Sequence, residues 1–169
     1  MKSLEDFETE HFVFVNYINM SIKQSFVIWE GRNHPEIRKW MTNSKPFSFE
    51  EHCRFIDNLK NRTDRLFWAV IYEGKVVGSY CLNPYSPDLK QGEMGKFLLP
   101  LFWGKGLAKL ITKEFLYYIL NNNIAKEINI KTLVENKKNQ HINELCGFRI
   151  CGQDEKYVYM KLTKEILYE

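Results

Sequence analysis

Two glycines between a strand and a long amphipathic helix constrain the fold of this chain more than any other feature. A strand is expected over residues 92–99, and Pro100 ends it. A helix is expected over residues 104–123, because apolar side chains recur there at helical spacing. Gly104 and Gly106 lack a Cβ, so the backbone can adopt positive φ and a ligand can approach it closely. The segment predicts a strand–turn–helix unit whose turn can hold a ligand.

The start of this helix is a candidate anion site. The free amides from Lys105 to Lys109 converge with the positive end of the helix dipole, which favours a pyrophosphate. The side chains of Lys105 and Lys109 add positive charge. The glycines alone are a weak motif, and a strand-to-helix turn without a ligand explains them equally well. A P-loop is excluded because no Gly-Lys-Ser/Thr follows, and a Rossmann turn is excluded because G-x-G-x-x-G is absent.

The order of the expected elements predicts one α/β domain over residues 1–169. Strands that alternate with helices favour a mixed sheet with helices on both faces. The helix after Ser48 begins with a capping box, in which Ser48 and Glu51 satisfy each other's free amides. The expected strands cover residues 11–20, 66–72, 75–82, 92–99, 128–134, 148–151 and 157–162, with a loop at 84–91; helices cover 21–31, a short turn ending at Met41, a segment after Ser48, 104–123 and 138–146.

Composition and charge exclude several classes of partner. The formal net charge is +3 and the basic residues are dispersed, so no nucleic acid is expected. The four cysteines form no C-x-x-C pair and no His pair has zinc-finger spacing, so no metal is expected. Apolar runs stay far below about 18 residues, so no membrane span is expected. Acidic residues within the first ten positions argue against a signal peptide, which makes a cytoplasmic location the default.

The glycine turn resembles the acetyl-CoA signature of the GNAT superfamily of N-acetyltransferases. In that signature, Q/R-x-x-G-x-G/A, Gly106 and Ala108 hold the small-residue places, and Trp103 stands where Gln or Arg is usual. The resemblance implies the GNAT fold, an α/β (α+β) architecture with a mixed, twisted sheet of seven strands and helices on both faces. It also implies acetyl-CoA as cosubstrate, held by the backbone amides of Phe97, Leu98 and Leu99 and by Trp103, Gly104, Lys105, Gly106, Leu107, Ala108 and Lys109.

A second segment, from Asn136 to Gly147-Phe148, resembles the closing pattern of the same superfamily. Asn136 and Asn139 are expected near the pantetheine arm, although simple helix capping explains them equally well. In many relatives, a Tyr five residues before the Phe protonates the departing thiolate, and that place is Asn143 here. Because Asn is not an acid, either water or another group of the chain protonates the thiolate, or the thiolate leaves without being protonated.

Acetyl transfer to an amine needs a base that removes the ammonium proton. Glu93 is the first candidate, because it lies on the strand four residues before Phe97 and on the same side of the pleat. An exposed strand residue at the loop edge is the alternative interpretation of Glu93. Glu135 is the reserve, and His34 and His52 are further candidates that are individually more typical of structural histidines.

The segment from Trp29 to Ile56 resembles the acceptor arm of the nucleotide-sugar N-acetyltransferases of pseudaminic acid synthesis. Those enzymes carry W-R-N-H/D-P-x-I-x-x-W-M and then E-x-H-x-x-F-I, whereas Gly31 is inserted before Arg32 here. The resemblance implies a UDP-linked 4-amino-4,6-dideoxy sugar as small-molecule substrate. Arg32 suits a diphosphate, and an apolar floor suits the 6-methyl group. The expected acceptor residues are Arg32, Asn33, Met41, Thr42, His52, Phe55 and Asn83, of which the apolar members are also explained as core.

The preferred interpretation is a sugar-nucleotide N-acetyltransferase that serves surface glycan synthesis or flagellin glycosylation. In this enzyme the amine attacks acetyl-CoA directly in a ternary complex. Two alternatives to this function remain. The first is a protein N-terminal acetyltransferase of the ribosomal-protein type, which the Trp-Gly-Lys-Gly turn suits. The second is a non-catalytic acyl-CoA-binding module, which Asn143 favours because the usual acid is missing. The family resemblance also implies a homodimer.

Overall fold

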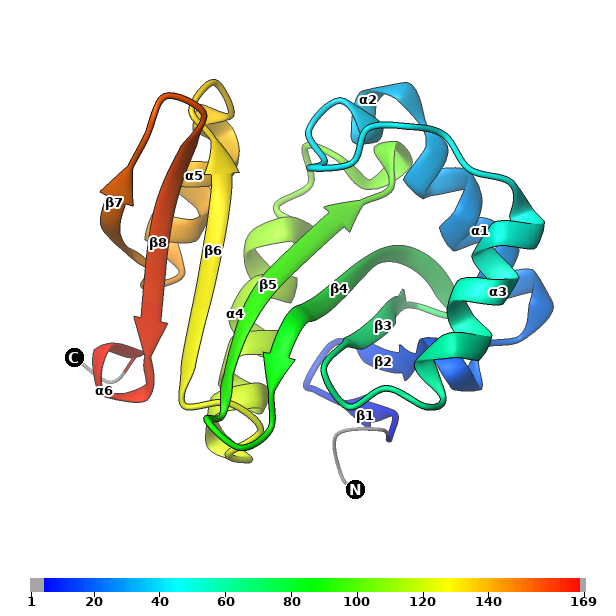
Figure 1. Ribbon diagram of the computed structural model, residues 1–169, viewed down its shortest axis with the longest axis horizontal. Coiled ribbons are helices and arrows are strands. Elements are labelled where there is room, and N and C mark those ends of the chain that lie inside the picture. The colour runs from blue at the N-terminus through cyan, green and yellow to red at the C-terminus, as the bar shows by residue number, and fades with distance from the viewer. Residues whose placement is uncertain (1–4, 168–169) are drawn as a thin grey trace.

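The structure, a computed structural model, describes residues 5–167, and eight strands in this range form one sheet in the order β1-β2-β3-β4-β5-β6-β8-β7 (Figure 1). Neighbouring strands are antiparallel except β5 and β6, which run parallel. The strands are β1 (Phe7–Glu8), β2 (Val13–Asn16), β3 (Leu66–Tyr72), β4 (Lys75–Ser86), β5 (Gln91–Leu98), β6 (Glu127–Leu133), β7 (Arg149–Gln153) and β8 (Tyr157–Thr163). The helices are α1 (Ile22–Asn33), α2 (Pro35–Arg38), α3 (Phe49–Leu59), α4 (Leu107–Asn121), α5 (Lys137–Leu145) and α6 (Lys164–Leu167).

The expected mixed sheet with helices on both faces is confirmed, with eight strands instead of seven. On one face, α4 packs Ile111 and Phe115 against Trp68 and Tyr80 of the central strands. On the other face, α1 and α3 join Tyr17 and Ala69 in a smaller core. In Figure 1, α4 and α5 lie behind the sheet and α1, α2 and α3 lie to its right. The two cores cover the sheet on both faces.

Three expected boundaries were wrong for local reasons. The strand expected over residues 11–20 ends at Asn16, because the Asn16 side chain accepts the backbone N–H of Ile18 and starts a 3-10 turn. The loop expected from Pro84 is part of β4, because a bulge between Leu82 and Tyr85 accommodates the proline. The long helix begins at Leu107, because both preceding glycines have positive φ.

The sheet splits between β5 and β6. The two strands pair only from Gln91↔Glu127 to Glu93↔Asn129, while β5 stays paired with β4 as far as Leu98. Figure 1 shows the two arrows diverging, with the loop between β5 and α4 at the open end. One backbone edge of β5 after Glu93 is therefore free of strand partners, which an extended ligand can use. We call this opening the splay.

The capping box at the start of α3 allows a test of local stability. The Ser48 hydroxyl accepts the Glu51 N–H at 3.1 Å, and the Glu51 carboxylate accepts the Ser48 N–H at 2.8 Å. Ser48→Ala should lower the free energy of unfolding by about 1 kcal/mol, because one amide loses its acceptor. Urea denaturation measures the change, and Ser44→Ala, in the exposed loop before α3, is the control. Equal stability of both variants would contradict the prediction.

Candidate active site

The turn between β5 and α4 is built on two glycines in the left-handed region. Gly104 and Gly106 both have φ of 75°, which only glycine adopts without strain. A Cβ at either position would meet nothing within 4 Å, so the backbone faces open space. The turn therefore presents bare backbone at the position where the sequence predicts a ligand.

The start of α4 has free amides and no side-chain cap. In contrast, Ser21, Ser48 and Asn136 cap the starts of α1, α3 and α5 with their side chains. The Gly106 carbonyl accepts the N–H of Leu110 at 3.4 Å, so the amides before Leu110 in this helix have no partner within the helix. Lys105 is exposed beside them. Free amides, a helix dipole and nearby ammonium groups fit the pyrophosphate of acetyl-CoA.

The free edge of β5 offers the amide of Leu98, but the amide of Leu99 is occupied. The Leu99 N–H donates to the Val77 carbonyl at 2.8 Å, so the expectation that it binds the cofactor was wrong. Because N–H directions alternate along a strand, the Leu98 N–H points to the splay and the Phe97 N–H points toward β4. The Trp103 indole donates to the Leu98 carbonyl at 2.7 Å, which places Trp103 at the mouth of the splay.

A polar network lines the splay on the face of α4 and α5. Lys96 of β5 donates to Asn143 Oδ1 at 2.8 Å and reaches Thr112 Oγ1 at 3.4 Å. Asn143 is fully buried, and its amide nitrogen lies 3.5 Å from Thr132 Oγ1. Asn139 donates to the same Thr132 oxygen at 3.1 Å. The network connects the two separated strands through α5.

Asn136 and Asn139 take structural positions at the start of α5. Asn136 Oδ1 accepts the Asn139 N–H at 3.2 Å, as expected of a helix cap. The side-chain amide of Asn139 donates to Thr132 Oγ1, which also accepts from the side-chain amide of Asn143. Both residues hold the α5 side of the splay in place.

Glu93 marks the point where β5 and β6 separate. It is the last β5 residue paired with β6, and its carboxylate lies 3.8 Å from the Lys131 ammonium. A pocket of about 380 Å³ opens here on the face opposite to Lys96, with Glu93, Asn129, Lys131 and Tyr159 among its lining residues. Glu135 is exposed on the turn between β6 and α5. The structure thus places Glu93 at the base of the splay and Glu135 outside it.

Arg32 and Glu93 both carry a charge that acts on the thiol of Cys81. Burial raises the pKa of Cys81 to about 12, while the charge of Glu93 raises it and that of Arg32 lowers it, so both charges act on this group. Arg32 Nη2 donates to the Asn43 carbonyl at 2.9 Å, whereas its buried Nη1 has no partner among the described residues. Burial also lowers the pKa of Arg32. A guanidinium with an unused buried donor can bind an anionic ligand.

The other residues expected to bind the acceptor divide into structural and exposed positions. Asn33 is fully engaged, because its amide donates to the Trp29 and Phe47 carbonyls and its oxygen accepts the Phe47 N–H. His52 is 3% exposed, its ring lies about 6 Å from those of Phe47 and Phe49, and burial lowers its pKa to about 4. The expectation that Asn33 contacts a nucleotide was wrong, whereas the buried Nε2 of His52 has no hydrogen-bond partner among the described residues.

Phe55 belongs mainly to the smaller core, where its ring packs edge-on against Phe67 at 5.1 Å. Met41 is half-buried and Thr42 is exposed in the loop between α2 and α3. Asn83 is exposed at the bulge of β4. These positions leave Met41, Thr42 and Asn83 available to a ligand.

The sequence prediction missed Lys96 and Thr112. The signal was present, because Lys96 alternates with Met94 and Leu98 on the face of β5 that meets α4. A lysine on the apolar face of a strand needs a polar partner, and Thr112 and Asn143 supply it.

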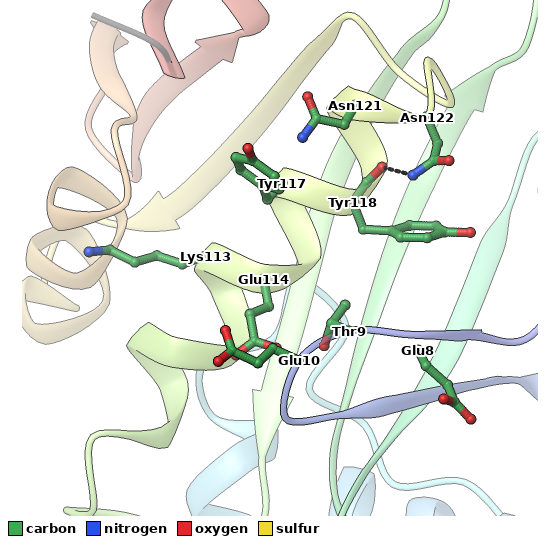
Figure 2. Close-up of a pocket in the computed structure, with 9 residues that line it drawn as sticks. All are labelled: Glu8, Thr9, Glu10, Lys113, Glu114, Tyr117, Tyr118, Asn121 and Asn122. Carbon is green, nitrogen blue, oxygen red and sulfur yellow. Dashed lines mark hydrogen bonds between the residues drawn. The ribbon is translucent and has the colours of Figure 1, made fainter.

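A second pocket lies away from the splay, between the first two strands and the outer face of α4 (Figure 2). It has a volume of about 540 Å³, and its lining includes Glu10, Lys113 and Tyr117. Glu114 is held there by His11, whose Nδ1 lies 2.7 Å from the carboxylate. No residue that the sequence predicts for acetyl transfer lines this pocket.

Residues 5–167 contain neither a cluster of metal ligands nor a helix suited to crossing a membrane. No three or more His, Cys, Asp or Glu side chains in this range gather where they could hold a metal ion. In the same part of the chain, no helix is long and apolar enough to cross a bilayer.

Comparisons with known proteins agree with the geometry. A family described as an acetyltransferase (GNAT) domain matches residues 24–149. The acetyltransferase PseH of Campylobacter jejuni is 26% identical over 151 residues, which cover 88% of this chain and 92% of PseH.

Two solved structures show the same fold. Campylobacter jejuni N-acetyltransferase PseH in complex with acetyl coenzyme A aligns with a TM-score of 0.73 and 18% identity, over 90% of this chain and 99% of that one. Spermidine N-acetyltransferase from Vibrio cholerae, in complex with CoA and spermine, aligns with a TM-score of 0.83 and 18% identity, over 94% of this chain and 99% of that one. At these identities, the two structures establish the architecture alone.

Proposed function

Because this chain belongs to the GNAT acetyltransferase domain family and is an acetyl-CoA-dependent N-acetyltransferase, we propose that it acetylates the amino group of a nucleotide-linked amino sugar. The observation that carries the proposal is the unpartnered, buried Nη1 of Arg32, whose charge acts on the same thiol as that of Glu93. The similarity to PseH and the resemblance of residues 29–56 to the enzymes of pseudaminic acid synthesis point to a UDP-4-amino-4,6-dideoxy sugar.

In the proposed complex, acetyl-CoA lies in the splay. The free amides at the start of α4 hold the pyrophosphate, with Lys105 and Lys109 beside them. The Leu98 N–H points toward the pantetheine arm and the thioester oxygen, because it lies on the free edge of β5. Trp103 limits the mouth of the splay by its bond to the Leu98 carbonyl.

The acceptor approaches from the face of α1 and α3. Arg32 binds the diphosphate through Nη1, and Met41, Thr42 and Asn83 are available for the sugar and nucleoside. Glu93 takes the ammonium proton, directly or through water, and the neutral amine attacks the thioester carbon in a ternary complex. The two substrates then enter from opposite faces of the sheet, so neither blocks the other.

The acceptor class can be tested by measuring free CoA released from acetyl-CoA. The panel contains UDP-4-amino-4,6-dideoxy sugars, other amino sugars, polyamines and peptides with basic N-termini. The proposal expects release with the UDP-amino sugars. A preference for the basic peptides would establish the N-terminal acetyltransferase instead, which the Trp-Gly-Lys-Gly turn also suits.

An Arg32→Ala variant tests the acceptor site. We expect the KM for the nucleotide sugar to rise by roughly 10- to 100-fold, because a charge-assisted bond of about 1.5–3 kcal/mol is lost. The affinity for acetyl-CoA should stay within about twofold, because Arg32 lies on the opposite face from α4.

The control for this variant is Arg54→Ala, which removes an exposed arginine paired with Glu50 on α3. It should leave both parameters unchanged. If Arg32→Ala weakened both substrates equally, misfolding and not loss of a diphosphate contact would be its cause, and thermal denaturation distinguishes the two.

A further inference from the structure

Lys96 is a partly buried cation in the splay without an acidic partner. Its ammonium donates to Asn143 Oδ1 at 2.8 Å and lies 3.4 Å from Thr112 Oγ1. Among residues 5–167, no carboxylate forms an ion pair with it. An ammonium has three N–H donors, so one remains after these two contacts. That donor is free for a ligand in the splay.

The titratable groups packed against Lys96 are neutral near pH 7. Tyr80 of β4 reaches the same Thr112 hydroxyl at 2.6 Å, and burial raises the pKa of this phenol. Cys146 follows α5, and burial raises the pKa of its thiol. Neither group supplies the negative charge that would balance an ammonium. An ammonium without a neighbouring negative charge can stabilise an anion that forms inside the splay.

Burial also adjusts the acidity of Lys96. Removal from water lowers its pKa to about 8, because the charged form is disfavoured. The group is therefore mostly an ammonium at pH 7. An ordinary thiol has a pKa of about 8.5, so a proton passes between the two with little change in free energy.

Lys96 lies on β5 within the stretch that faces the splay. Lys96 lies between Glu93, at the base of the splay, and Leu98, whose amide points into the splay, where the proposed complex places the thioester. Its hydrogen-bond partner Asn143 occupies the place where the resemblance implies a tyrosine acid. Asn143 has no proton to give, but its oxygen holds the ammonium in place.

We propose that Lys96 is the catalytic acid that protonates the departing sulfur of coenzyme A. The inference rests on the proposed function, because it needs acetyl-CoA in the splay. The amine nitrogen forms a bond to the thioester carbon, and the carbon–sulfur bond breaks with its electron pair on sulfur. Lys96 Nζ gives one proton to that sulfur and becomes a neutral amine. The proton that Glu93 takes from the substrate leaves to solvent, and water returns one to Lys96.

This arrangement separates acid and base. Glu93 and Lys96 differ by three residues on β5, so their side chains lie on opposite faces of the strand. The base meets the acceptor in the pocket on one face, and the acid meets the sulfur beside α4 and α5 on the other. The two groups therefore do not neutralise each other before reaction.

The test compares calorimetric binding of coenzyme A and desulfo-coenzyme A, which lacks the thiol, at pH 7.5, which is below the pKa of Lys96 and keeps most of this group in the ammonium form. Wild-type protein should bind coenzyme A about tenfold more tightly, through stabilisation of the thiolate by the ammonium. Lys96→Met, whose unbranched side chain is one atom shorter and carries no charge, should bind both ligands equally. Its affinity for desulfo-coenzyme A should match that of wild type within about twofold, as a folded variant requires.

A second variant keeps the inference testable if Lys96→Met does not fold. Lys96→Arg retains a positive charge but cannot release a proton at these pH values. It should keep the preference for coenzyme A yet lower kcat by about 10²-fold with the acceptor found in the panel. A wild-type preference in Lys96→Met, or a wild-type kcat in Lys96→Arg, would overturn the role of Lys96. Failure of wild-type protein to bind either ligand would instead overturn the proposed function.

Discussion

A Gly106→Glu variant will lose its affinity for acetyl-CoA by roughly 100-fold or more. Gly106 has φ of 75°, where a residue with a Cβ costs about 1–2 kcal/mol. The new carboxylate would stand at the uncapped start of α4, where the pyrophosphate is proposed to bind. It would both repel the phosphates and accept the free amides that they need. Isothermal titration calorimetry with acetyl-CoA measures the loss.

Gly74→Glu is a matched control for this variant. Gly74 has φ of 77° in the turn between β3 and β4, and a Cβ there also meets nothing within 4 Å. The substitution therefore introduces the same charge and a similar backbone strain away from the site. Thermal stability should fall in both variants, but acetyl-CoA affinity should fall only in Gly106→Glu. Unchanged affinity in Gly106→Glu would remove the cofactor from this turn.

Those parts of the fold that depend on local signals were predictable from the sequence. The capping box at Ser48, the glycines before α4 and the turn at Glu73-Gly74 each specify their own backbone geometry within a few residues. The helices and the antiparallel strands β3, β4 and β5 accordingly lie close to their predicted positions. Alternating strands and helices then implied a sheet with helices on both faces, which the structure confirms.

The eighth strand depends on contacts that are distant in sequence. β1 has only two residues and carries no strand pattern of its own. Phe7 stacks on Phe14 at 4.5 Å and on Tyr118 of α4 at 3.8 Å, which holds β1 against the sheet. Because Tyr118 lies more than one hundred residues away, no local pattern predicted this strand.

The same distinction separates the predicted from the unpredicted site residues. The start of α4 was identified because its glycines and free amides act through the backbone, which the local sequence determines. Asn33 and His52 have residue types that suit a ligand, but Phe47 engages the first and encloses the second. Lys96 was missed because its significance comes from Asn143, which lies 47 residues further along the chain. Whether a polar side chain is available to bind a ligand therefore depends on its partners in the fold, which the residue type alone does not show.

Substitution of Glu93 by Gln should lower kcat by about 10²- to 10³-fold, because general base catalysis typically contributes an effect of this size. Gln keeps the shape and can still accept a hydrogen bond, but it cannot take a proton at neutral pH. Glu93 stands where β5 and β6 separate, with its side chain in the pocket that also contains Lys131. The KM values should change little, because the pairing of Gln91 and Gly92 with β6 is retained.

Glu127→Gln controls for the loss of a carboxylate near a lysine on this sheet. Glu127 lies 3.4 Å from Lys161, as Glu93 lies 3.8 Å from Lys131, and both are ion pairs between neighbouring strands. If Glu93 acts only through its ion pair, both variants should show the same small effect on kcat. If it is the base, only Glu93→Gln should be slow, and raising the pH should restore part of its rate because the acceptor amine then loses its proton to water. A wild-type rate for Glu93→Gln at pH 7 would assign the proton to another group, with Glu135 as the next carboxylate to substitute.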